Sequence, residues 1–168
     1  MSEPTPERVL KGESYLSPTG LRTFKDEPIQ RLHARGALWP KSADINTRLL
    51  EAAQRYAKDH YLANMNPLAS FDPTRVFSGG TGAGGVYPAS EKQLEHRQAH
   101  RAAQKAVGKF YLEAVNLVVI HEENDLAAIG RKISGLSSPD AGRAVAMERL
   151  RAGLYLLAMH YGTLGTVH

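Results

Sequence analysis

The chain has 168 residues and a formal charge of +4, from 21 Lys and Arg residues against 17 Asp and Glu residues. This length suits one domain with a hydrophobic core, and the 42% hydrophobic and 23% charged residues are typical of a globular protein. The chain has no cysteine, which excludes disulfides and cysteine–zinc sites, and no recognisable signal peptide, so we expect a cytoplasmic protein. The mildly basic balance permits nucleic-acid binding without requiring it.

Residues 1–28 are expected to form a flexible N-terminal arm, because prolines, glycines and charges mix there without a helical or strand period. Helices are predicted over residues 29–38 and 44–65. In the second helix an apolar stripe is expected to face the core, with the charged residues on the solvated face. The stripe comprises Ile45, Leu49, Ala52, Ala53, Tyr56, His60 and Ala63, and the solvated face comprises Arg48, Glu51, Arg55, Lys58 and Asp59.

Residues 66–89 form a long glycine-rich segment, which we interpret as a loop. Gly80, Gly82 and Gly85 have the spacing G-x-G-x-x-G of a dinucleotide-binding turn. That turn needs a buried strand before it and a helix starting within it, and the sequence predicts neither. The pattern therefore favours a mobile tip over a nucleotide site, and a backbone that lies against nucleic acid or polymerase is a third possibility.

Residues 90–107 are predicted to form a polar helix that begins with a capping box of Ser90 and Gln93. One side is small and apolar, and the surface becomes basic toward the C-terminus, which suits the helix dipole. The apolar side comprises Leu94, Ala99, Ala102, Ala103 and Ala106, and the basic surface comprises Arg97, Arg101, Lys105 and, just beyond the helix, Lys109.

His96 and His100 stand four residues apart on this helix, a spacing at which both could face one metal ion. The cationic Arg97 lies between them and the glutamate of a catalytic H-E-x-x-H motif is absent, so we interpret both histidines as part of a solvated face. The sequence predicts neither a metal nor another cofactor. No nucleophile elbow, cysteine nucleophile or matched acid–base pair is present, so it predicts no enzyme either.

Residues 109–122 are apolar almost all round, which predicts a central core helix. The longest strongly apolar run, residues 114–120, is far too short to span a membrane.

Residues 125–161 predict a short helix, a turn at residues 134–138 and a long helix, with small residues where the two helices cross. Ser138 is expected to cap the long helix, with Pro139 at its first position. One interpretation is a DNA-binding helix-turn-helix; the other, weighed equally, is a plain helical hairpin with solvated arginines. In the first, Arg143 reaches base edges and Arg131, Lys132, Ser137 and Ser138 contact phosphates. Arg149 and Arg151 could extend that contact or bind a protein.

Residues 125–157, DLAAIGRKIS…RAVAMERLRAGL, resemble the helix-turn-helix of region four of sigma factors. The chain departs from that pattern in its longer turn and in Asp140, which stands where a polar or basic contact residue is usual. Residues 48–162 are also similar to a helical domain of alphaproteobacterial regulators, including relatives in phages and gene transfer agents. That resemblance rests on LLEAAQRYAKDHY, SFDPTRVFSGG and ERLRAGLYLLAMHYG, and it implies control of transcription.

Together these features predict an all-α protein, an orthogonal bundle of five or six helices over residues 29–162 with a tail at 163–168. The expected function is a phage-like transcription regulator that acts on promoter DNA, RNA polymerase or another transcription factor, as an activator or antiterminator. The alternative is an assembly adaptor of the small-terminase type, in which the helical domain mainly oligomerises.

Overall fold

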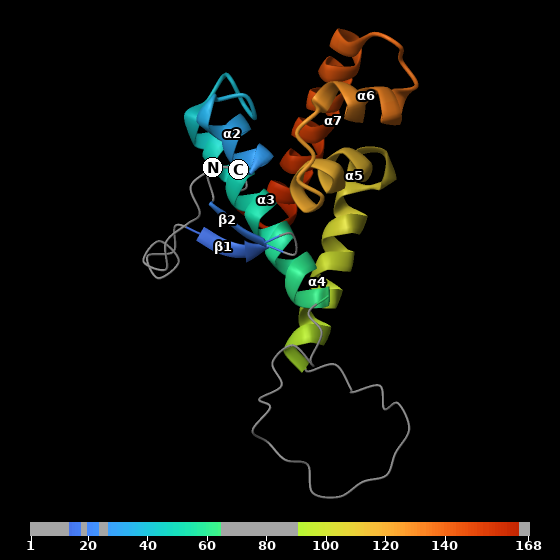
Figure 1. The fold of residues 1–168 in the computed structure, drawn as a ribbon. Coiled ribbons are helices and arrows are strands. Elements are labelled where there is room, and N and C mark those ends of the chain that lie inside the picture. The colour runs from blue at the N-terminus through green and yellow to red at the C-terminus, as the bar shows by residue number, and fades with distance from the viewer. Residues whose placement is uncertain (1–13, 18–19, 24–26, 65–90, 165–168) are drawn as a thin grey trace, which may run out of the picture.

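The structure is a computed structural model that describes residues 14–17, 20–23, 27–64 and 91–164. The expected helical class is confirmed. The glycine-rich segment 66–89 and residues 165–168 lie outside the described residues, as does most of the arm. The elements in order are β1 (Ser14–Ser17), β2 (Gly20–Thr23), α2 (Pro28–Ala34), α3 (Ala43–Asn64), α4 (Glu91–Val107), α5 (Lys109–Val115), the π-helical segment η3 (Asn116–Ile120), α6 (Leu126–Ser134) and α7 (Pro139–His160) (Figure 1).

Two short strands within the arm differ from the expectation of no strand. β1 and β2 pair antiparallel, with Tyr15 opposite Arg22 and Leu16 opposite Leu21. Each strand has only four residues, so a period of two cannot be distinguished in the sequence from chance order.

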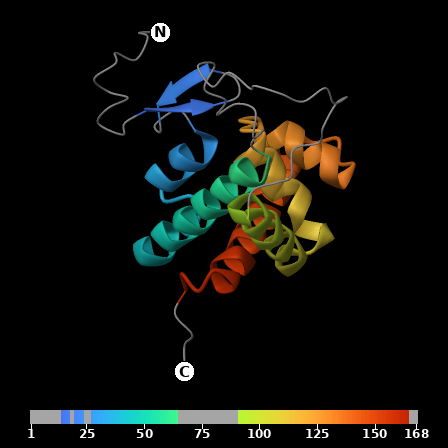
Figure 2. The same cartoon turned by 90° about the horizontal axis from the view of Figure 1, so that it is seen from below.

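The hydrophobic core lies where α3, α4 and α7 pack side by side (Figure 2). Tyr56 of α3 is fully buried, as are Leu150, Leu154 and Leu157 of α7. The stripe predicted for α3 is thus largely confirmed, and the long C-terminal helix supplies the opposite side of the core through residues spaced three and four apart.

The expectation of a uniformly buried helix over residues 109–122 is wrong in its first half. Gly108, with φ +74°, separates α4 from α5, and the first turn of α5 lies at the surface. Phe110 is 61% exposed, and burial is nearly complete only from Ala114 to Val119. An all-apolar sequence does not specify which turn is covered, because coverage depends on neighbours that come from elsewhere in the chain.

The ends of α6 and α7 are fixed by local hydrogen bonds and a glycine, and Ser138 and Pro139 take the positions expected from the sequence. The carboxylate of Asp125 accepts hydrogen bonds from the N–H groups of Ala127 and Ala128, both at 3.0 Å. The Ser138 hydroxyl accepts one from Ala141 N–H at 3.5 Å, ahead of Pro139 at the first helical position. Gly135 ends α6 in the left-handed conformation, which carries no steric cost for glycine.

Helices α6 and α7 cross at a pair of glycines, as the small residues predict. A Cβ added to Gly130 would lie 1.7 Å from the carbonyl oxygen of Gly142, and one added to Gly142 would lie 2.9 Å from the carbonyl oxygen of Ala127. Each backbone thus occupies the space where the other helix would carry a side chain. The position of α6 on α7 therefore depends on both residues being glycine.

We expect Gly130→Ala to lower the free energy of unfolding by about 2–3 kcal/mol, because the two helices must separate to admit the methyl group. The matched control is Gly135→Ala, where nothing lies within 4 Å and only the left-handed backbone (φ +72°) is strained, a cost of about 1 kcal/mol. Urea unfolding of both variants measures the difference. Equal losses would show that the close approach is not what constrains the crossing.

Candidate nucleic-acid interface

The α6–α7 tip, defined as α6, residues 135–138 and the first two turns of α7, projects beyond α5 at one end of the molecule (Figure 1). Gly142 is buried against α6, whereas its neighbour Arg143 is exposed. Arg131 and Lys132 are exposed on the last turn of α6. None of these three cations forms an ion pair within the part of the chain that the structure describes. The tip therefore carries cations that are accessible to a partner.

Two serines and one aspartate are also exposed on the α6–α7 tip. Ser137 and Ser138 are both exposed, and the Ser138 hydroxyl caps α7 while its own hydrogen stays available for donation. Asp140 is exposed in the first turn of α7, three residues before Arg143 and so on the same side of the helix. Its carboxylate interacts favourably with the positive end of the helix dipole. The same negative charge weakens the attraction between Arg143 and a phosphate.

The second group of predicted cations lies on α4 and at the start of α5. Arg97, Arg101 and Lys105 recur every four residues, so they share one exposed face, and Lys109 follows beyond Gly108. Arg97 is partly engaged, because its Nε–H donates to the carbonyl oxygen of Ala63 at 3.0 Å. This bond fixes the first turns of α4 to the end of α3.

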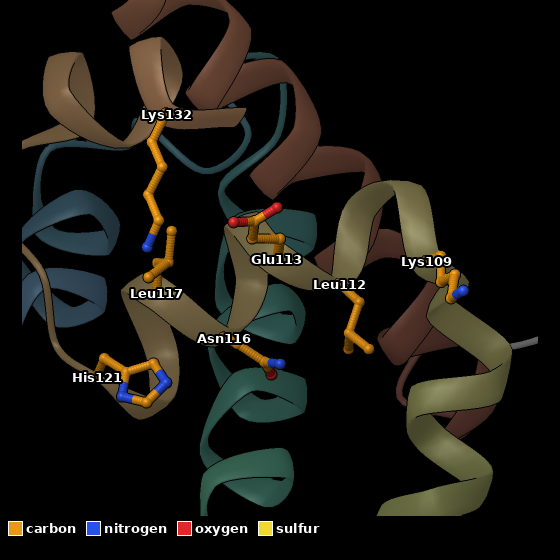
Figure 3. Close-up of a pocket in the computed structure, with 7 residues that line it drawn as sticks. All are labelled: Lys109, Leu112, Glu113, Asn116, Leu117, His121 and Lys132. Carbon is orange, nitrogen blue, oxygen red and sulfur yellow. The ribbon is translucent and has the colours of Figure 1, made fainter. Parts of the chain in front are cut away.

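A groove between α5, η3 and α6 brings one residue of each basic group together. Lys132 extends from α6 toward η3, and Lys109 lies at the other side of the groove (Figure 3). Glu113 places a carboxylate between them, so the groove is not uniformly basic. The groove has a volume of about 350 Å³, and its remaining lining residues are Leu112, Asn116, Leu117 and His121.

Arg149 and Arg151, considered as further contact residues, have structural roles instead. Arg149 donates to the carbonyl oxygen of Ile133 at 3.1 Å and lies 4.0 Å over the Phe110 ring. Arg151 donates twice to the carbonyl oxygen of Ala37, at 3.0 and 2.7 Å. The Ile133 carbonyl lies in the last turn of α6, where intrahelical partners run out, and Ala37 lies in the segment that follows α2. Both arginines are only partly exposed.

Asp59 does not lie on a solvated face, contrary to the sequence prediction. It is only 6% exposed, and its carboxylate accepts from the Tyr161 hydroxyl at 2.9 Å and lies 3.0 Å from Nδ1 of His96. Burial and this hydrogen bond to Asp59 raise the pKa of Tyr161 well above its usual value. The residue joins α3, α4 and the end of α7 in one buried polar contact.

The prediction of a solvated face for His96 and His100 is also wrong. His100 is buried, with its ring stacked 4.9 Å from that of Tyr56, and His96 is half-buried beside Asp59. The buried side of α4 consists of Gln93, His100, Ala103 and Val107, whereas Leu94, Ala102 and Ala106 of the expected apolar side are exposed.

Within the described ranges, no group of three His, Cys, Asp or Glu side chains is placed to hold a metal ion. Among the same residues, no helix has the length and apolar character needed to cross a membrane. In comparisons with family models, curated proteins and solved structures, the chain has no match.

We expect Arg149→Met to lower the free energy of unfolding by about 1–2 kcal/mol, because it leaves the Ile133 carbonyl without its donor and removes the contact with Phe110. The same change at the exposed Arg143 should cost less than about 0.5 kcal/mol. Thermal and urea unfolding of the two variants test this assignment. A comparable loss at Arg143 would contradict the distinction between structural and accessible arginines.

Proposed function

We propose that the protein is a phage-like transcription regulator that binds promoter DNA, RNA polymerase or both through a sigma-like helix-turn-helix formed by the α6–α7 tip. The observation that carries the proposal is the exposure of Arg131, Lys132 and Arg143 on a projecting pair of helices, with no acidic partner among the described residues. An activator or an antiterminator would fit this arrangement.

In this proposal the N-terminal part of α7 enters the major groove, as the second helix of a helix-turn-helix does. Arg143 is exposed there and has the length and donors to bind guanine. Arg131, Lys132 and the hydroxyls of Ser137 and Ser138 contact the flanking phosphates and set the position of the helix. Asp140 lies three residues before Arg143 and disfavours close approach to a phosphate, so it weakens the electrostatic part of the contact made by α7.

The basic face of α4 supplies a second contact in this proposal. Lys109 and Lys132 line the same groove, and Lys109 follows Arg97, Arg101 and Lys105 just beyond the end of α4. In a DNA complex, these cations would contact phosphates beyond those bound by the tip. In a complex with RNA polymerase, they would contact an acidic surface of the polymerase. The first partner predicts binding that weakens steeply with salt, by an amount set by the number of phosphates contacted.

A pull-down from bacterial lysate with the full chain, with and without nuclease treatment, separates the two partners. Polymerase that remains bound after nuclease treatment supports direct docking, and polymerase that is lost supports association through DNA. If neither polymerase nor DNA is enriched over a bead control, the proposal fails.

For DNA binding, we expect Arg131→Ala and Arg143→Ala each to weaken binding to a mixed-sequence duplex of about two turns, by roughly threefold or more. The double variant should reduce the slope of log K against log salt by about one to two, because one cationic contact is lost at each position. Arg35→Ala, at the exposed end of α2 away from the tip, is the control. Unchanged affinity and slope in the double variant would rule out DNA recognition by the tip.

The alternative, an assembly adaptor of the small-terminase type, predicts a large closed oligomer. The mass of the protein in solution distinguishes the two, since a regulator that acts through the α6–α7 tip is expected as a small species. A ring of eight or more subunits would replace the regulator proposal with the adaptor.

A further inference from the structure

A group of histidines is enclosed between α3 and α4, away from the α6–α7 tip. The ring of His100 lies between Tyr56 and His60, with its centroid 4.9 Å from each of theirs. His100 is only 9% exposed, and its Nε2 has no hydrogen-bond partner. A buried polar nitrogen without a partner is uncommon in folded proteins and calls for an explanation.

The neutral imidazole is the form that suits this position. Protonation would place a second N–H donor and a positive charge in a site that offers Nε2 no acceptor. Burial lowers the pKa of His100, and the neighbouring His60 lowers it further, while Asp59 raises it. Burial also lowers the pKa of His60, with a contribution from His121.

The elements packed around the pair add one carboxylate, one guanidinium group, two tyrosine hydroxyls and further imidazole rings. Asp59 is occupied by Tyr161 and His96, so its carboxylate is shared rather than reserved for His100. The Tyr56 hydroxyl donates to the side-chain oxygen of Asn116 at 2.7 Å. The titratable and charged groups around the pair are Tyr56, Asp59 and Arg55 from α3, His96 from α4, His121 after η3, and Tyr161 at the end of α7. The ring of His160 contacts that of Tyr161 edge-on.

We propose that His60 and His100 form an acid-sensitive latch that holds α4 against α3 while both rings are neutral and releases it when they are protonated. Two imidazolium rings at a centroid distance of 4.9 Å would repel each other inside the helix interface. Around the pair, the first half of α4 is held to α3 by polar contacts, from Gln93 and Arg97 to the Ala63 carbonyl and from His96 to Asp59. The second half of α4 is anchored in the hydrophobic core by Ala103 and Val107. Charging the pair would therefore loosen the first half of α4 before the second half and before the α6–α7 pair.

The direction of the pH dependence follows from the lowered pKa values. Above the ordinary histidine value of about 6.5, both the folded and the unfolded chain hold neutral rings and the latch contributes its full stability. As the pH falls below that value, the unfolded or opened chain binds protons that the closed chain excludes, so stability is lost progressively toward the folded-state pKa. Since α4 also carries Arg97, Arg101 and Lys105, opening would displace that basic face.

The first test is an NMR titration of the histidine side chains in the full chain between about pH 8 and pH 4.5, with signals assigned by His60→Gln and His100→Gln. We expect His60 and His100 to titrate below about pH 6.5. If both titrate at or above that value, the latch is excluded. The titration is measured on the unmodified protein, and the variants serve only to assign the signals.

The second test is amide hydrogen exchange at about pH 7.5 and pH 5, corrected for the intrinsic effect of pH. Exchange in α3 and α4 should rise several-fold at the lower pH, with a smaller rise in α6. His100→Phe keeps a ring beside Tyr56 but cannot be protonated, and His60→Gln removes the other ring; both should reduce the rise.

The matched control is His33→Gln on α2, whose side chain lies 3.3 Å from the Thr47 hydroxyl, outside this group. It should respond to acid as the unmodified chain does. A rise that persists in the His60→Gln, His100→Phe double variant, or one that is equal in α6 and α4, would overturn the proposal.

Discussion

The close contact of two backbones, at Gly130 and Gly142, is the constraint on which the exposed end of the molecule depends. With no Cβ on either residue, α6 lies directly on α7, and Arg131 and Arg143, which follow the two glycines, are exposed. Asp125, Gly135 and Ser138 fix the ends of the two helices, so the turn is held by capping rather than by burial. The result is a projecting tip whose cationic side chains are not engaged in contacts that hold the fold together.

Arginines in this chain divide according to what their guanidinium groups contact. Arg149 and Arg151 donate to backbone carbonyls and help join distant segments. Arg131 and Arg143 are exposed and have no such contact among the described residues. The net positive charge of the chain does not reveal this division. Only arginines of the second group are accessible to nucleic acid.

The sequence predicted the helices well because their ends carry local signals. Capping by Ser138, the proline at 139 and the apolar steps of α7 are all short-range features. It failed at Asp59 and His100, although both lie at helical spacing from buried residues: Asp59 three after Tyr56, and His100 three before Ala103. Their polarity led to a solvated assignment, and the partner that pairs with Asp59, Tyr161, is 102 residues away. Long-range pairing of this kind cannot be read from one sequence.

Contact between the α6–α7 tip and nucleic acid can be measured by NMR chemical-shift mapping of the full chain with a mixed-sequence duplex at low salt. We expect the amide signals that shift to cluster at the last turn of α6, residues 135–138 and the first turns of α7, with weaker shifts along the basic face of α4. Shifts confined to α2 and the start of α3, or none at duplex concentrations of about 10⁻⁴ M, where non-specific binding is expected, would contradict it.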